Sequence, residues 1–175
     1  MKVLIVIDMQ NDFTTGVLGN EQTAAVVERV ADEIKNFREN EKDGRIIATL
    51  DTHFADYLKT QEGKNLPVPH CIRYTEGWSL DPLVKEALGD DFKVVEKLTF
   101  GAIDLPIVVG WEETIEEIRI IGVCTDICVI SNAMIVKSAF PEIPVKVIAD
   151  CCAGTTPESH ENALNAMKAC QIIIE

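Results

Sequence analysis

Four residues whose side chains can do acid–base or nucleophilic chemistry stand where apolar segments of this chain end. Asp8, Asp51 and Lys97 each come directly or shortly after a short apolar run, and Cys128 follows the apolar run at 118–123. A thiol that lies beside a carboxylate and an ammonium group can give up its proton and become a nucleophile. These positions therefore favour a site in which Cys128 acts as a nucleophile, provided that the fold brings the four residues together.

Cys128 lies at a predicted junction between a strand and a helix. Thr125 and Asp126 are residue types favoured at helix N-caps, and apolar residues recur at helical spacing from Ile127 onward. Cys128 is then expected in the first helical turn, where unpaired N–H groups and the helix dipole stabilise a thiolate or an oxyanion. A cysteine at such a junction is also often a small buried hydrophobe, so the assignment depends on its partners.

The elements that must position these residues alternate along the chain. Their strands are apolar on both faces, which is typical of a parallel sheet covered by helices on each side. In such a sheet the ligand site lies at the carboxyl ends of the strands. We predict strands at 3–7, 45–50, 92–95, 118–123, 145–149 and 172–174, and helices at 23–37, 82–88, 112–117 (the end of a helix), from Ile127 onward, and at 157–169. This pattern predicts a three-layer α/β fold in a single domain, 1–175.

Composition narrows the class of function. The chain has 175 residues and a formal net charge of −13, which argues against nucleic acid or an anionic membrane surface as a partner. The first apolar run is only five residues long and ends at Asp8, too short for a signal sequence or a membrane span. Six cysteines without an export signal are expected to be free thiols in the cytoplasm.

Several motifs together resemble a known family. They are Val6 to Phe13 (VIDMQNDF), Lys97 followed by Phe100, Gly122 to Cys128 (GVCTDIC), and a late pattern formed by residues 150–153 with His160. In this order the motifs resemble the isochorismatase-like cysteine hydrolases, a superfamily that includes nicotinamidases. The resemblance covers nearly the whole chain and implies a Rossmann-like three-layer fold.

The resemblance also implies roles for individual residues. Cys128 matches the nucleophile, Asp8 the carboxylate that transfers protons, and Lys97 the cation that completes an Asp-Lys-Cys triad. It implies a cis peptide bond just before Cys124, so that the backbone N–H groups of Cys124 and Cys128 face the developing oxyanion. Phe13 and Phe100 are expected to contact the substrate.

A metal site is expected at the two ends of the long segment 51–79. One carboxylate and two imidazoles suit a divalent ion, and Asp51, His53 and His70 match the metal ligands of nicotinamidases by resemblance. Many nicotinamidases have a further histidine where this chain has Lys59. Glu62 is a candidate substitute, although it also reads as a surface carboxylate. Zn²⁺ is the expected ion, with Fe²⁺ or Mn²⁺ as alternatives.

One departure from the nicotinamidase pattern concerns the pocket. Nicotinamidases typically have an aromatic residue shortly before the second metal histidine, where it stacks on the pyridine ring. This chain has no aromatic residue at 66–69, and Trp78, Tyr74 or Phe100 could supply that wall instead. The metal ligands favour nicotinamide as the substrate, whereas the missing aromatic residue speaks against it.

The sequence therefore predicts a metal-dependent amidohydrolase, with nicotinamide and water giving nicotinate and ammonia through a cysteine thioester. The expected partner is a small-molecule amide, and a homo-oligomer is expected from the resemblance. One alternative is an isochorismatase-like hydrolase of another small amide, carbamoyl or vinyl-ether substrate. The other is a catalytically silent interaction domain, against which Asp8, Lys97 and Cys128 all speak.

Overall fold

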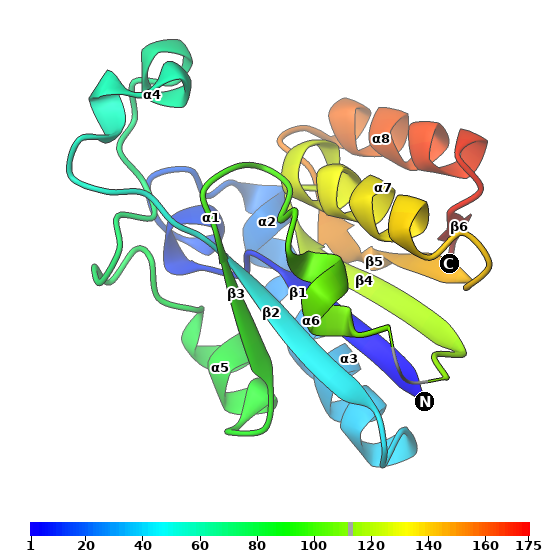
Figure 1. Ribbon diagram of the computed structural model, residues 1–175. Coiled ribbons are helices and arrows are strands. Elements are labelled where there is room, and N and C mark those ends of the chain that lie inside the picture. Colours follow the sequence, from blue (N-terminus) through cyan, green and yellow to red (C-terminus); the bar gives the residue numbers. More distant parts are fainter. Residues whose placement is uncertain (112–113) are drawn as a thin grey trace.

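A six-stranded parallel sheet forms the centre of the molecule (Figure 1). The computed structural model describes residues 1–111 and 114–175. The strands are ordered β3-β2-β1-β4-β5-β6 across the sheet. Their bounds are β1 (Lys2–Ile7), β2 (Arg45–Asp51), β3 (Lys93–Lys97), β4 (Glu117–Val123), β5 (Val145–Ala153) and β6 (Ile173–Ile174). The parallel pairing confirms the predicted sheet type.

Helices cover both faces of this sheet. One face packs against α3 (Val27–Asn40) and α5 (Pro82–Leu88), and the other against α6 (Leu105–Val109), α7 (Ile130–Ala139) and α8 (Pro157–Ala169). The central strand β1 is apolar from Val3 to Ile7 because it is buried on both faces. Its alternate side chains point to opposite faces, and they enter two different clusters of buried residues. The predicted three-layer α/β fold is confirmed.

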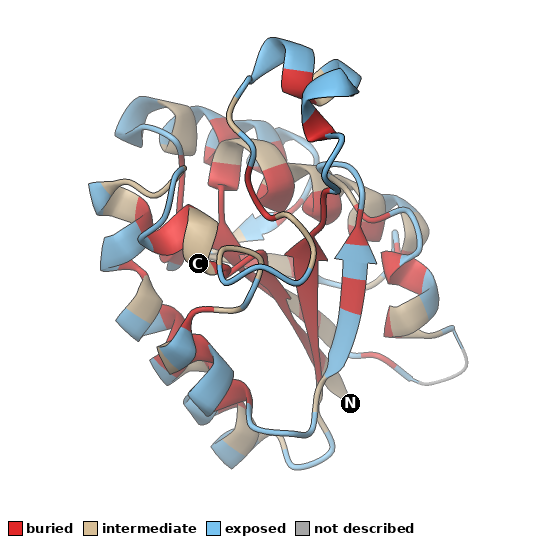
Figure 2. Cartoon of the chain, turned by 90° about the vertical axis from the view of Figure 1, so that its left-hand side faces the viewer, coloured by how far each residue is buried: buried red, intermediate tan, exposed pale blue. Residues whose placement is uncertain are grey.

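The carboxyl edge of the sheet carries the short elements that surround the candidate site. These are α1 (Asn11–Thr14), α2 (Glu21–Ala25), η1 (Tyr57–Lys59), α4 (Gln61–Asn65) and the π-helix η2 (Thr125–Val129). Figure 1 shows that the segment with α4 projects beyond the strands at this edge. In Figure 2 the same segment is largely exposed, as is the edge strand β3, whereas the inner strands are mostly buried.

β1 and β4 approach each other closely near this edge. Gly122 has a φ of +116°, and a Cβ atom there would lie 2.2 Å from the carbonyl oxygen of Ile7. No other residue type fits this position, because a side chain would push the two strands apart. The glycine thus brings the backbone after Ile7 next to the turn that begins at Cys124.

Some predicted bounds differ from the observed ones. The helix expected at 23–37 is two helices, α2 and α3, that meet at Val26, and the strand expected at 145–149 continues to Ala153. The prediction that a helix ends at 112–117 is wrong for residues 114–117, which are not helical. Residues 114–116 are irregular, because the N–H of Glu116 bonds to the carbonyl of Met1, and Glu117 already begins β4. Glu112 and Glu113 lie outside the described residues. The sequence pattern does not predict the short helices at Asn11–Thr14, Tyr57–Lys59, Gln61–Asn65 and Leu105–Val109.

Within residues 1–111 and 114–175, no helix combines the length and the apolar character that crossing a bilayer requires.

Candidate active site

The carboxyl ends of four neighbouring strands bring Asp8, Asp51, Lys97 and Cys128 together. The Lys97 Nζ atom lies 2.8 Å from Asp8 Oδ2, 3.0 Å from Asp51 Oδ1 and 3.5 Å from Cys128 Sγ. All four residues are buried. The predicted triad residues are therefore in mutual contact, with the ammonium group between two carboxylates and the thiol.

Burial and charge together set the protonation of this cluster. Burial raises the pKa of Asp8, although the adjacent Lys97 opposes that rise. Burial alone would lower the pKa of Lys97, but Asp8, Cys128 and Asp51 outweigh it and raise that pKa well above its usual value. Lys97 is therefore a permanent cation, and Asp8 is a stronger base than an exposed aspartate.

Burial, rather than its place at the start of a helix, decides the protonation of the Cys128 thiol. Burial raises its pKa well above the usual value, the charge of Asp8 raises it further, and Lys97 offsets only part of the rise. The helix dipole is a small effect beside the removal of a thiolate from water. The resting group is a neutral thiol, which needs a base, and Asp8 interacts with it directly.

Thr49 on β2 fixes the carboxylate of Asp8. Its hydroxyl donates to Asp8 Oδ1 at 2.6 Å and accepts from the backbone N–H of Asp8 at 3.2 Å. Asp8 has a φ of +47°, a conformation that residues other than glycine seldom adopt, and both residues are fully buried. Sequence reasoning missed Thr49. The only available signal was a polar residue inside the apolar strand, two positions before Asp51.

The turn that carries Cys128 is a π-helix rather than the first turn of an α-helix. Cys124 occupies its N-cap position, and the peptide bond between Val123 and Cys124 is cis, as the resemblance implied. The expected capping by Thr125 and Asp126 is wrong, because both side chains bind residues near α8 instead. The Thr125 hydroxyl and the His160 Nδ1 atom share a 2.8 Å hydrogen bond, and the Asp126 carboxylate accepts from the N–H and hydroxyl of Thr155.

Asn132 on α7 joins this turn to the loop that follows β3. Its Nδ2 group donates to the carbonyls of Cys128 at 2.7 Å and Phe100 at 3.1 Å. Its Oδ1 atom accepts from the N–H of Ala102 at 2.9 Å. This fully buried amide therefore holds the backbone of Cys128 and that of the Phe100 loop in a fixed relation. No sequence pattern pointed to it.

The four predicted metal ligands converge beside the same cluster. Asp51, His53, Glu62 and His70 each offer a ligand atom within 4.8 Å of the others. Asp51 Oδ2 lies 3.1 Å from His53 Nε2 and 3.5 Å from His70 Nε2, and Glu62 Oε1 lies 3.5 Å and 3.7 Å from the same two nitrogens. Two imidazoles and two carboxylates, of which only Glu62 is partly exposed, form a donor set suited to Zn²⁺ or a similar divalent ion.

The surroundings of these ligands orient them. The His70 Nδ1 atom lies 2.8 Å from the carbonyl of Val68, so its Nε2 atom is left to face the cluster. Hydrogen bonds from His53 and His70, together with the charge of Lys97, lower the pKa of Asp51 despite its burial. The side chain of Gln10 binds both the N–H and the carbonyl of Asp51. Asp51 is therefore ionised and held in place, as metal binding requires.

A small cavity of about 50 Å³ joins the metal-ligand cluster to the thiol. Asp51, Glu62 and His70 line it on one side and Cys128 on another. Its apolar walls are Phe13, Leu18, Leu66, Phe100 and Ile127. The two predicted substrate contacts thus lie at this cavity, and Leu66 occupies the wall for which no aromatic residue was found.

Two of the three aromatic residues considered for that wall lie elsewhere. Trp78 donates from its indole N–H to the Thr52 hydroxyl, and Tyr74 is 78% exposed with its ring against Trp78. Phe100 is the one of the three that lines the cavity. The expectation that Trp78 or Tyr74 could form the wall is therefore wrong, because the turn at 74–78 packs away from the thiol.

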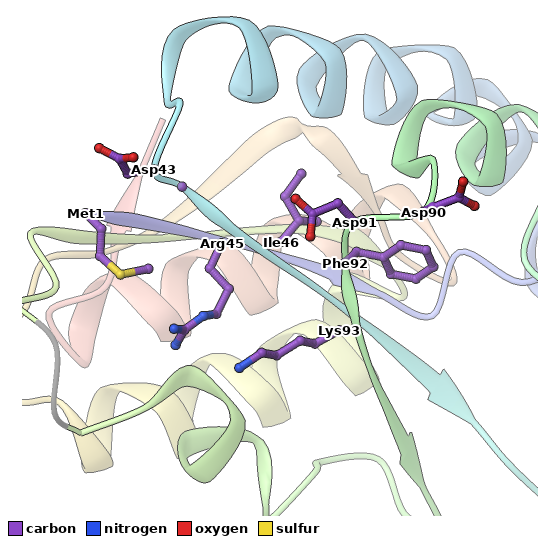
Figure 3. A pocket seen from close by; sticks show the side chains of 9 residues that line it. Met1, Asp43, Arg45, Ile46, Asp90, Asp91, Phe92 and Lys93 are labelled. Carbon is purple, nitrogen blue, oxygen red and sulfur yellow. The ribbon is translucent and has the colours of Figure 1, made fainter.

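A separate polar cavity of about 350 Å³ lies at the amino ends of β2 and β3 (Figure 3). Arg45 and Lys93 line it together with Asp43, Asp90 and Asp91. Among the described residues, its lining shares no member with the cavity over the thiol. It lies at the opposite end of the strands and is not part of the candidate active site.

Comparison with known proteins identifies the family. The family model described as the isochorismatase domain matches residues 2–175. The chain belongs to the isochorismatase family. A nicotinamidase/pyrazinamidase of Mycobacterium tuberculosis is 23% identical over 98% of this chain and 97% of its own length.

Solved structures extend the comparison. The nicotinamidase/pyrazinamidase of Bacillus subtilis is 28% identical, with a TM-score of 0.84 over 99% of each chain. The pyrazinamidase of Pyrococcus horikoshii, solved in complex with zinc, is 28% identical, with a TM-score of 0.83 over 99% of this chain and 98% of that chain. The predicted family and its fold are thereby confirmed, whereas the roles of the individual site residues stay predictions.

Proposed function

We propose that this isochorismatase-family protein hydrolyses nicotinamide to nicotinate and ammonia through a thioester on Cys128. Its relatives support the broader statement that it is a hydrolase acting on an amide. One observation carries the proposal. The Lys97 ammonium contacts the Asp8 carboxylate, the Cys128 thiol and the metal-ligand Asp51, all within 3.5 Å. This arrangement links a nucleophile, a base and a cation-binding group in one buried site.

The first half of the reaction forms the thioester. Asp8 accepts the proton of the Cys128 thiol, and the sulfur attacks the amide carbonyl carbon. The carbonyl electrons move to oxygen, where the N–H groups of Cys124 and Cys128 stabilise the negative charge. The carbon–nitrogen bond then breaks, and Asp8 returns the proton to the leaving nitrogen, which departs as ammonia. Lys97 remains protonated and stabilises both the carboxylate and the forming thiolate.

The second half releases the acid. Asp8, ionised again, accepts a proton from water as the water oxygen attacks the thioester carbon. The carbon–sulfur bond breaks, nicotinic acid forms, and the proton on Asp8 returns to the sulfur. The balance therefore needs only one water molecule besides the substrate. A base with a raised pKa suits both transfers, because it holds the proton long enough to return it.

The metal part of the proposal assigns Asp51, His53, Glu62 and His70 as ligands. The burial of Asp51, His53 and His70, the convergence of all four side chains and the orientation of His70 by Val68 fit a divalent ion. When bound, such an ion supplies a Lewis acid and a fixed positive charge beside the thiol cavity. The zinc complex of the Pyrococcus horikoshii pyrazinamidase supports zinc as the first ion to test.

Ammonia release from nicotinamide tests the proposal. We expect chelator-treated protein to regain activity with Zn²⁺, Mn²⁺ or Fe²⁺, and Cys128→Ala to lose it under every metal. Cys170→Ala is the matched control, because Cys170 is exposed and does not line the cavity over the thiol. Full activity in Cys128→Ala would refute the thioester mechanism.

A second candidate is hydrolysis of another small amide or carbamoyl compound by the same residues. Leu66 favours it, because an aliphatic wall stacks less well on a pyridine ring than an aromatic one does. Ammonia released from a non-aromatic amide or carbamoyl compound, but not from nicotinamide, would select this candidate.

A further inference from the structure

A second, larger cavity opens beside the one over the thiol. It has a volume of about 570 Å³, and Glu62, Leu66, Phe100 and Ile127 line both cavities. The inner cavity, at about 50 Å³, is far below the size of about 300–1,000 Å³ that is usual for small-molecule sites, whereas the outer cavity falls within that range. Because they share four lining residues, the two cavities are adjoining parts of one binding region.

The outer cavity shares much of its apolar lining with the inner one and adds Leu98 to it. His53 and Glu62 lie at its metal-ligand end, and the apolar residues Leu98, Phe100 and Ile127 form its wall opposite Leu66. The remaining lining residues are polar: Thr60, Gln61, Asn65 and Thr99. Leu98 and Phe100 are 62% and 48% exposed, so this wall presents apolar surface to the open cavity. Such a surface favours the binding of apolar groups.

Hydrogen bonds fix both walls of the outer cavity. On one side, Asn132 binds the carbonyl of Phe100, and the Thr99 hydroxyl donates to the carbonyl of Gly101. On the other side, the hydroxyl of the buried Tyr57 donates to the carbonyl of Leu66 at 2.9 Å. The walls are therefore pre-formed, and a ligand that fits between them loses little free energy in ordering them.

We propose that the outer cavity is a substrate subsite for an apolar substituent on the acyl part of the amide. The inference rests on the proposed function, in which the amide group reacts in the inner cavity next to Cys128. The substrate class is then a carboxamide, such as a pyridine carboxamide, that carries an alkyl or aryl extension of several carbons. The extension lies against Leu98, Phe100 and Ile127.

Alkyl derivatives of nicotinamide test this inference in two ways. The first measurement is kcat/KM for ammonia release from nicotinamide and from its 5-methyl, 5-propyl and 5-butyl derivatives with the zinc-loaded protein. The second is the Kd of the same compounds for Cys128→Ala, measured by calorimetry, which does not require turnover. We expect Kd to fall roughly fourfold for each methylene group that the cavity buries, from the usual transfer free energy of that group.

A pair of variants locates the effect. Leu98→Asn should abolish most of the advantage of the butyl compound over nicotinamide, because Leu98 lines only the outer cavity. Ile103→Asn is the matched control. Ile103 is 82% exposed and follows the same strand, but it lines neither cavity. Its ratio of butyl to unsubstituted affinity should equal that of the parent protein.

The outcomes separate the two proposals. Tighter binding with chain length, lost in Leu98→Asn and kept in Ile103→Asn, supports the subsite. Equal or weaker binding of the alkyl compounds overturns the subsite, whether or not nicotinamide is hydrolysed. The same result is expected if a second copy of the chain covers this wall. Absence of ammonia from every compound overturns the proposed function, while the Kd series still decides the subsite.

Discussion

The hydrogen bond between Thr49 and Asp8 gives the sharpest test of how this site controls its base. Thr49→Val keeps the shape of the side chain but removes the donor to Asp8 Oδ1 and the acceptor for the N–H of Asp8. Both residues are fully buried, so water cannot replace either partner. The change therefore acts on Asp8 with little disturbance of the packing around it.

The magnitude follows from the charge of the acceptor. A hydrogen bond to an ionised group contributes about 1.5–3 kcal/mol, and one pKa unit corresponds to about 1.36 kcal/mol. Burial already raises the pKa of Asp8, and the Thr49 hydroxyl opposes that rise. Its removal should raise the pKa of Asp8 by a further unit or two, because the ionised form loses more than the neutral form does.

The assay is the pH dependence of kcat/KM for ammonia release. The acidic limb of the profile, which reports the base of the free enzyme, should move upward by about one to two pH units in Thr49→Val. Below that limb the variant should be roughly 10- to 100-fold slower than the parent protein, and the two should approach each other at alkaline pH. Thr49→Ser is the control, because it retains the hydroxyl.

Stability provides an independent reading of the same change. An acid whose pKa is raised by folding loses stability as pH rises through that pKa. The deficit of Thr49→Val in free energy of unfolding should thus be about 1.5–3 kcal/mol where Asp8 is ionised and smaller where it is protonated. A variant whose acidic limb coincides with that of the parent, and whose deficit does not change with pH, would refute the role given to Thr49.

Three other perturbations have defined outcomes. Asn132→Leu should lower the free energy of unfolding, measured in urea, by about 2–3 kcal/mol, because the buried backbone groups of Ala102 and Cys128 lose their hydrogen bonds. It should also slow alkylation or turnover at Cys128. Unchanged stability would contradict this expectation. His70→Ala should weaken Zn²⁺ binding by more than about 100-fold in competition with a chromogenic chelator. Lys146 and Arg119 lower the pKa of Glu117 against the effect of burial, so the stability that its charge supplies is lost as pH falls through that lowered pKa. Glu117→Gln should therefore be about 1 kcal/mol less stable at pH 7, and the gap should close below about pH 4; a gap independent of pH would exclude the ion pairs as its cause.

The location of the site could be predicted from the sequence, because it depends on local patterns. Apolar runs give strands, strands that are apolar on both faces give a parallel sheet, and the carboxyl ends of parallel strands meet at one edge. Asp8, Asp51, Lys97 and Cys128 each follow such a run, so their convergence required only the topology. The resemblance added Glu62 as an alternative ligand, and the fold placed it beside His53 and His70.

The details that tune the site could not be predicted in this way. The contact of Thr49 with Asp8 depends on the register between β1 and β2, in which Val6 pairs with Ala48. The expected capping by Thr125 and Asp126 failed for a related reason. Their side chains found partners near α8, a segment about thirty residues away in the chain.

The sequence by itself determined the layers of the fold, the edge at which chemistry occurs and the residue types available there. Only the tertiary structure decided that burial keeps Cys128 a neutral thiol, that Leu66 forms the wall over it, and that this wall continues into a second cavity. The physical reason is the separation along the chain between the residues that interact. Strand and helix patterns reflect neighbours along the chain, whereas desolvation, strand register and cavity shape depend on atoms that only folding brings together.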